Sequence, residues 1–182
     1  MYYALATTVR IMDRAFLIVA AVGLIAMMLH ISGDILMSLI FNAPIATTSA
    51  IVTSYYMIAV AFLPILAAEY RGNQISVSLL TDMLSPRARY GLGTLVMGIT
   101  AAAYILLTVQ SWQQAVDKLA IGAFVVEQTS RIPVWPAFFM LPLAFGAMAL
   151  LLVLKAVLRL IGGPVLAAPG SPEIIDAETQ DV

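Results

Sequence analysis

The chain has 182 residues, of which 62% are hydrophobic and only 10% charged, proportions that differ strongly from those of soluble domains. With a formal net charge of −1 and sparse basic residues, it offers no support for nucleic-acid binding. It has no cysteine, which excludes disulfides, thiolate metal sites and cysteine nucleophiles. The high hydrophobic share and the low charged share together indicate an integral membrane protein.

The first apolar run extends from Ala15 to about Phe41, after a short segment, Met1 to Arg14, that suits a membrane interface. About 20 apolar residues are enough to cross the hydrocarbon core of a bilayer, which is roughly 30 Å thick. A cleaved signal peptide would have a shorter apolar core and a small-residue cleavage site. We therefore expect this first span to be retained.

A second apolar run covers about residues 46–68, and an amphipathic segment follows at about residues 73–85. If that segment is helical, its apolar side chains share one broad arc opposite serine, threonine and aspartate, as in a helix lying flat in a membrane interface. The alternation of Ile75, Val77 and Leu79 also fits a strand, but an unpaired strand leaves backbone groups unsatisfied in lipid. We prefer the interfacial helix.

Two further runs predict spans at about residues 90–115 and 134–161. The expected fold is thus all-α and integral to the membrane, with four transmembrane helices and an amphipathic interfacial helix between the second and third. Residues 162–182 contain glycine, proline and acidic residues but no basic residue, which predicts a disordered acidic tail.

Basic residues are distributed unevenly between the two sides of this predicted topology. One side has only Lys118 and Arg131, and the other has the remaining seven: Arg10, Arg14, Arg71, Arg87, Arg89, Lys155 and Arg159. Under the positive-inside rule, both termini and the amphipathic segment are cytoplasmic. We expect a multi-pass protein of the bacterial inner membrane.

Two predictions concern helix shape and packing. Thr94, Gly98 and Ala102 repeat every four residues along the third span, and small residues at this spacing let helices approach closely in lipid. Pro64 in the second span and Pro142 in the fourth each free a backbone carbonyl, so we expect kinks there.

A histidine and an aspartate in the first span, His30 and Asp34, are four residues apart and share one helical face. Ionisable groups within a span are functional candidates by default. They could bond each other or a neighbouring helix, or they could form a proton or ion relay. We favour a packing role, because an ion path normally recruits polar partners from other spans.

Charged residues also mark the ends of the second and third spans. Glu69 and Arg71 are two apart and point to different sides of a helix, so we expect them to reach away from each other. Together with Gln74 they are candidates for polar contacts within the membrane or with a larger partner. Arg87 and Arg89 suit anionic lipid headgroups.

The chain lacks a phosphate-binding glycine loop, a His-Glu-x-x-His motif and a Gly-x-Ser-x-Gly motif, and His30 is its single histidine. A hydrolase needs a nucleophile with a base, or a metal with its ligands. We expect no metal or cofactor site and no autonomous enzyme. The alternatives are a membrane scaffold or assembly protein unrelated to transport and, with less support, a membrane-embedded enzyme using His30 and Asp34.

Four short motifs, in their order and spacing, resemble the small membrane subunit of tripartite ATP-independent periplasmic (TRAP) transporters, a DctQ-like protein. They are FNAPI at residues 41–45, EYRGNQISV at 69–77, IPVWP at 132–136 and LPLAFG at 141–146. The resemblance extends from Ala15 to Ile161.

This resemblance implies a small permease subunit that adds to the static scaffold of a large membrane subunit. That large subunit would hold the substrate and sodium sites, and a periplasmic binding protein would deliver an organic acid. The outer segment from Lys118 to Arg131, with Glu127, would then help to dock the binding protein.

Overall fold

The computed structural model describes residues 2–72, 85–127, 130–161 and 166–167. Four helical segments are long and apolar enough to cross a membrane: Ala6–Phe41, Thr48–Tyr70, Tyr90–Ala120 and Trp135–Leu160. The all-α, four-span fold is confirmed. The predicted interfacial helix and Gln74 lie outside the described residues, apart from Ser85.

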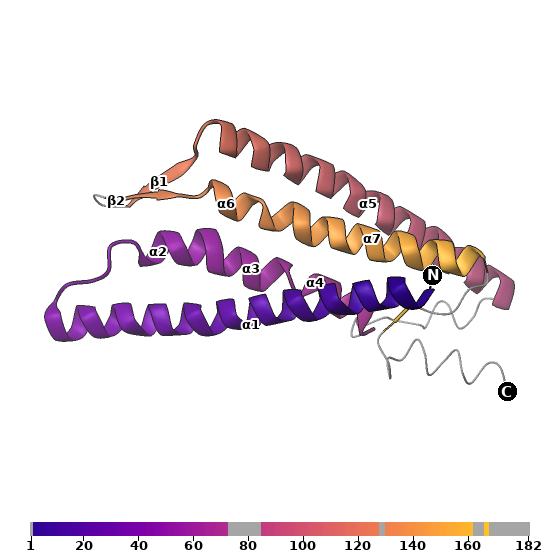
Figure 1. Cartoon of the computed structure of the whole chain (residues 1–182), viewed down its shortest axis with the longest axis horizontal. Helices are drawn as coiled ribbons and strands as arrows, with labels where there is room; N and C mark the ends of the chain where they lie inside the picture. The colour runs from indigo at the N-terminus through magenta and orange to yellow at the C-terminus, as the bar shows by residue number, and fades with distance from the viewer. Residues whose placement is uncertain (1, 73–84, 128–129, 162–165, 168–182) are drawn as a thin grey trace.

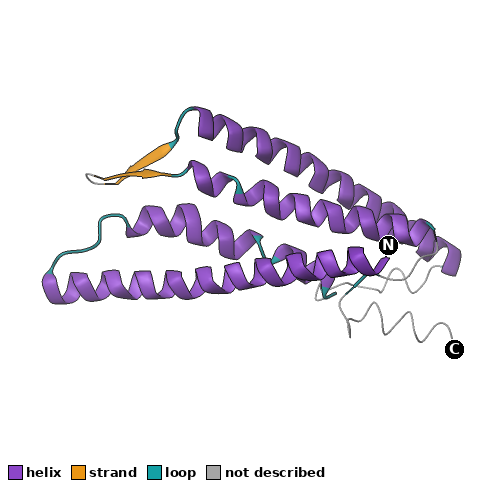
Figure 2. Cartoon of the chain, in the orientation of Figure 1, coloured by secondary structure: helices purple, strands orange, loops and turns teal. Residues whose placement is uncertain are grey.

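The first span is one unbroken helix, α1 (Tyr2–Phe41), so residues before Arg14 continue the span instead of forming the separate segment that the sequence predicted. The second span is built from four pieces in succession: α2 (Thr48–Ile51), the π-helical turn η1 (Val52–Tyr56), α3 (Met57–Phe62) and α4 (Ile65–Tyr70). Figure 2 shows the contrast between the two spans.

Local chemistry explains the interruption near the middle of the second span. Pro64 has no backbone N–H and its ring clashes with the preceding turn, so α3 ends at Phe62 and α4 begins at Ile65. Nearer the start of this span, the N–H of Met57 donates to the carbonyl of Val52, which closes the wider π-turn. The second span therefore has two irregular points in 23 residues.

The third span, α5 (Pro86–Ala120), begins with a side-chain cap. The Ser85 hydroxyl accepts a hydrogen bond from the N–H of Ala88, and Pro86 occupies the first helical position, where its fixed φ suits a helix start. The helix ends at Ala120, and Gly122 has the positive φ of 57° that turns the chain. The helix thus extends beyond both ends of the predicted range, whereas the apolar span Tyr90–Ala120 begins where predicted and ends later.

A short antiparallel β-hairpin, which the sequence did not predict, follows α5. It consists of β1 (Phe124–Glu127) and β2 (Ser130–Pro133), paired with Val126 opposite Arg131. The fourth span follows as α6 (Trp135–Phe138) and α7 (Met140–Leu160). The break between them falls at Phe139, before Pro142, which lies in the first turn of α7.

The spans form two helical hairpins, α1 with α2–α4 and α5 with α6–α7 (Figure 1). We call the end of the bundle with the N-terminus, the end of α4, the start of α5 and the end of α7 the basic end, and the opposite end the β-hairpin end. Helix α7 contacts both α5 and the second span, and so lies between them.

Burial differs sharply among the four spans. In the most apolar stretch of each helix, 44% of residues are buried in the fourth span, 28% in the second and only 6% in the first and the third. At the basic end, Val9, Leu66, Tyr70 and Leu151 pack in one cluster with Leu166, from the part of the tail that is described. The bundle therefore buries most residues on α7 and the second span, whereas few residues in the apolar stretches of α1 and α5 are buried.

Candidate functional site

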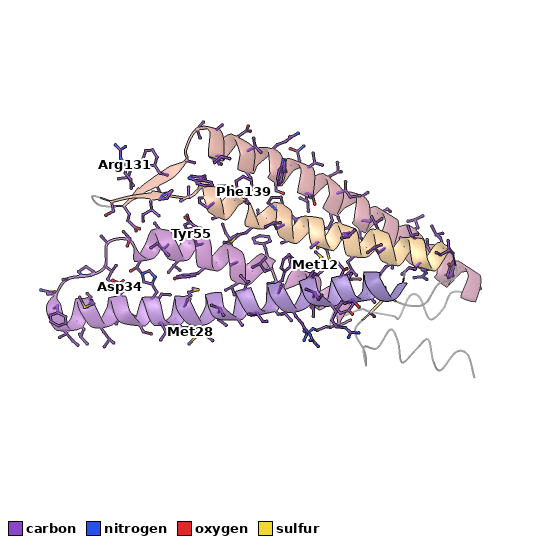
Figure 3. The ribbon with its side chains drawn as sticks, in the orientation of Figure 1. Met12, Met28, Asp34, Tyr55, Arg131 and Phe139 are labelled. Carbon is purple, nitrogen blue, oxygen red and sulfur yellow. The ribbon has the colours of Figure 1, made fainter. Side chains whose placement is uncertain are left out.

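Asp34 lies where α1 faces the start of the second span (Figure 3), and His30 lies one turn before it on α1. The Asp34 carboxylate accepts a hydrogen bond of 2.6 Å from the backbone N–H of Ile45. The His30 ring meets the Tyr56 ring edge-on, with 6.0 Å between their centroids. Each residue thus has a partner in the first hairpin, and Asp34 fixes the loop that follows α1.

A buried ion pair joins the two helical hairpins at the basic end. The Lys155 ammonium lies 2.9 Å from a Glu69 carboxylate oxygen and also donates to the Glu69 backbone carbonyl. Their side chains are 5% and 15% exposed. Because one residue comes from α7 and the other from α4, this contact holds the second hairpin against the first.

A second ion pair at the same end lies within the first hairpin. The Arg71 guanidinium contacts the Asp13 carboxylate at 3.0 Å, with the aspartate side chain 4% exposed and the arginine side chain 44% exposed. The other Asp13 oxygen is buried and makes no hydrogen bond with the described residues. Glu69 and Arg71 therefore reach different helices, as their spacing predicted.

At the β-hairpin end, two hydrogen bonds join the second span to the outer segment. The Glu127 carboxylate accepts from the N–H of Ala50 at 2.7 Å, and the Tyr55 hydroxyl donates to the Pro133 carbonyl at 2.5 Å. Ala50 lies in the first turn of α2, where backbone N–H groups lack helical partners, so Glu127 caps this helix from a distant part of the chain.

The three residues expected to dock a binding protein all lie at the β-hairpin end. Lys118 lies 5.7 Å from the centre of the Phe138 ring, and Arg131 lies 5.0 Å from the centre of the Phe124 ring. The Glu127 carboxylate, by contrast, already accepts a hydrogen bond from the backbone N–H of Ala50. Docking by this residue would have to share its carboxylate with the helix cap.

The small-residue stripe of α5 does not face α7. The α5 side chains packed in the cluster with α7 are Met97, Ala101 and Tyr104, one quarter-turn away from the stripe. Gly98 and Ala102 are exposed, and a Cβ atom added at Gly98 would meet nothing within 4 Å. Gly98 and Ala102 thus present an open surface in the described part of the chain, whereas Thr94 is half-buried and its hydroxyl donates to the Tyr90 carbonyl.

Further along α5, polar side chains that the sequence analysis did not single out line an open cavity of about 440 Å³ between α5 and α7. Its polar wall consists of Gln110, Ser111, Gln113, Gln114 and Asp117, opposite Leu141 and Phe145. These polar residues recur every three or four positions, a pattern from which a polar helix face could have been predicted. Asp13, Tyr55 and Lys155 also take part in contacts that the sequence did not predict.

The family model for "Tripartite ATP-independent periplasmic transporters, DctQ component" matches residues 27–162, which is more than half of the chain. The chain belongs to the DctQ family. The resemblance drawn from the sequence motifs is thereby confirmed. A comparison with curated proteins gave no match.

Membership in the DctQ family makes this chain a component of a transporter, and the family is not one of enzymes. The matched range includes His30, the Glu69–Lys155 ion pair, the cavity and the β-hairpin, whereas Asp13 precedes it. Arg87 and Arg89 lie in the first turn of α5, but their side chains are outside the described part of the structure.

Proposed function

We propose that this DctQ protein is the small permease subunit of a TRAP transporter and supports a large membrane subunit. The large subunit carries out sodium-coupled uptake of an organic acid, which a periplasmic binding protein delivers. The observation that carries the proposal is the low burial of α1 and α5. In the most apolar stretch of each, only 6% of the residues are buried within the chain. Each of these spans therefore leaves many exposed apolar side chains that the chain itself does not cover, and these provide area for a partner.

The contact with the large subunit is proposed to include the stripe of Thr94, Gly98 and Ala102. In lipid, helix association depends on close packing, and small residues allow the backbones to approach. Gly98 and Ala102 are exposed on a face that α7 leaves uncovered. We further propose polar contacts to the large subunit near His30, Asp34, Glu69, Arg71 and Gln74.

The β-hairpin end is proposed to face the periplasm and to dock the binding protein through Lys118, Glu127 and Arg131. Support comes from the charge distribution, since the other seven basic residues of the sequence lie toward the opposite end of the predicted topology. The basic end and both termini would then be cytoplasmic. The membrane is proposed to be the bacterial inner membrane, with Arg87 and Arg89 at its lipid headgroups.

Co-purification in mild detergent tests the proposed subunit role. The full chain is expressed with the large-subunit gene next to its own, and the ratio of large to small subunit is measured after affinity capture of the small one. We expect Ala102→Ile to lower this ratio several-fold, because a bulky side chain would separate closely packed helices. The matched control is Ala103→Ile, since Ala103 is also exposed but lies off the stripe.

Equal ratios for the two variants would exclude the stripe as the contact while leaving the subunit role intact. If the unaltered chain captures no large membrane protein, and its deletion leaves organic-acid uptake unchanged, the proposed function is wrong.

A further inference from the structure

Arg159 has a role in neither the ion pairs nor the contacts between the helical hairpins. It lies in the last turn of α7, and the ring it contacts, that of Tyr90, belongs to the first residue of the third apolar span. Both residues thus mark the boundary where the apolar stretches end at the basic end of the bundle. Lipid phosphates lie at such boundaries, just beyond the hydrocarbon core.

Tyr90 contacts Arg159 in three ways, two of them through the guanidinium and one through the backbone carbonyl. Its guanidinium carbon lies 4.7 Å from the centre of the Tyr90 ring, which is a cation–π contact. Its Nη2 donates to the Tyr90 carbonyl at 3.4 Å, and the Tyr90 hydroxyl donates in return to the Arg159 carbonyl at 2.6 Å. The two residues therefore fix each other between α5 and α7.

Gly93 leaves the space that this arrangement needs. A Cβ atom at this position would lie 2.9 Å from Nη2 and 3.2 Å from Nη1 of Arg159, so the guanidinium at the end of this flexible side chain would have to move. At Gly98, five residues further along α5, an added Cβ would meet nothing within 4 Å. The guanidinium thus lies directly over Gly93, where a side chain would displace it, and we call Tyr90 and Gly93 its seat.

The positive charge of Arg159 is unpaired among the described residues, whereas Arg71 and Lys155 each have a carboxylate partner. Among the described residues, one of its N–H groups is used, in the long bond to the Tyr90 carbonyl. A guanidinium presents its remaining donors in a planar fork, and that geometry matches a phosphate. Holding the fork in place lowers the entropy that binding would cost.

The surroundings favour a lipid phosphate over a free one. Exposed apolar side chains lie beside Arg159 in the sequence, with Leu160 67% and Ile161 72% exposed, and others follow Tyr90 along α5, with Leu95 58% exposed. Acyl chains cover such side chains, while a soluble anion gains nothing from them. The sequence also carries Arg87 and Arg89 in the turn that precedes the seat.

We propose that Arg159, held by its seat of Tyr90 and Gly93, binds the phosphate of an anionic phospholipid in the leaflet at the basic end. The site does not depend on the subunit role proposed above, because all its residues belong to this chain. It adds a specific lipid contact at the junction between α5 and α7.

The test compares phosphatidylglycerol with phosphatidylcholine on the purified full chain in a neutral detergent. Retained lipid is measured by native mass spectrometry, and the midpoint of thermal unfolding is recorded as each lipid is titrated. We expect preferential retention of phosphatidylglycerol and a higher unfolding midpoint. Arg159→Gln should weaken the apparent affinity for phosphatidylglycerol about fivefold, as expected for one basic group at a lipid surface.

Two glycine substitutions give a matched pair that leaves every charge in place. Gly93→Ala should displace the guanidinium and reduce phosphatidylglycerol retention toward that of Arg159→Gln, whereas Gly98→Ala should keep the preference of the unaltered chain. Circular dichroism and gel filtration check that each variant is folded. The same variants are then tested for co-purification with the large subunit.

Four results would overturn the proposal. The unaltered chain could show no preference for phosphatidylglycerol, or Gly93→Ala and Gly98→Ala could behave alike in folded protein. In the third, inorganic phosphate would raise the unfolding midpoint as much as the lipid, which would identify a simple anion site. Loss of the large subunit in Arg159→Gln with lipid preference unchanged would assign the guanidinium to a protein partner instead.

Discussion

The two ends of the bundle join the same helical hairpins by different chemistry. At the basic end, Lys155 and Glu69 form a charged pair whose side chains are 5% and 15% exposed. At the β-hairpin end, Glu127 and Tyr55 bond to backbone groups, and the Tyr55 contact is exposed. A charge left alone in a buried site costs far more than a backbone group that water can reach. The hairpins should therefore separate first at the β-hairpin end.

The largest effect is expected from Lys155→Met. This substitution leaves the Glu69 carboxylate buried without its partner, and removal of one member of such a pair typically costs about 3–5 kcal/mol. The free energy of unfolding, measured by denaturant titration in mild detergent, should fall by that amount.

The control for this first prediction removes both charges at once. In Lys155→Met combined with Glu69→Met no unpaired charge is left at this contact, and apolar replacements of buried pairs are often neutral. The double variant should recover most of the lost stability. If it is as unstable as the single variant, the cost arises from lost packing and the comparison between the two ends fails.

A smaller effect is expected from Glu127→Ala at the opposite end. It removes the cap on the N–H of Ala50, and loss of a cap costs about 1 kcal/mol. Amide hydrogen exchange should become faster in the first turn of α2, while exchange in α4 should remain unchanged. Glu127→Gln retains an acceptor oxygen and should show a smaller change, so an equal loss in both variants would point to charge and not to capping.

The smallest effect is expected from Tyr55→Phe, which removes only the hydrogen bond to Pro133. Side-chain hydrogen bonds between membrane helices contribute about 0.6 kcal/mol on average. The control is Tyr56→Phe, because the Tyr56 hydroxyl forms no hydrogen bond with the described residues while its ring, which contacts His30, is retained. A thermal midpoint lowered more by the control than by Tyr55→Phe would contradict the assignment.

The fold was predictable because its main signal is local. Uninterrupted apolar runs predict spans, Pro64 predicts an interruption, and short motifs in the right order indicate the family. The β-hairpin escaped prediction because Phe124 and Val125 lie in a short stretch beside helical spans, where a brief apolar run fits several structures.

The contacts between helices could not be predicted in the same way. Glu69 and Lys155 are 86 residues apart, and no local pattern says which of several basic residues would reach this carboxylate. Helical spacing did predict that Glu69 and Arg71 diverge, and it did place His30 and Asp34 on one face. The partners of these side chains depend on how the helical hairpins pack together, and helical periodicity carries no information about that packing.

Helix α1 runs for 40 residues without interruption, a length of about 60 Å. That is twice the roughly 30 Å thickness of the hydrocarbon core, so the helix extends past it on both sides unless it leans steeply. Because the helix is unbroken, we expect a displacement of one end of α1 to be transmitted to the other end. The neighbouring span is interrupted at the π-turn and at Pro64, so we expect it to bend at these points under the same displacement.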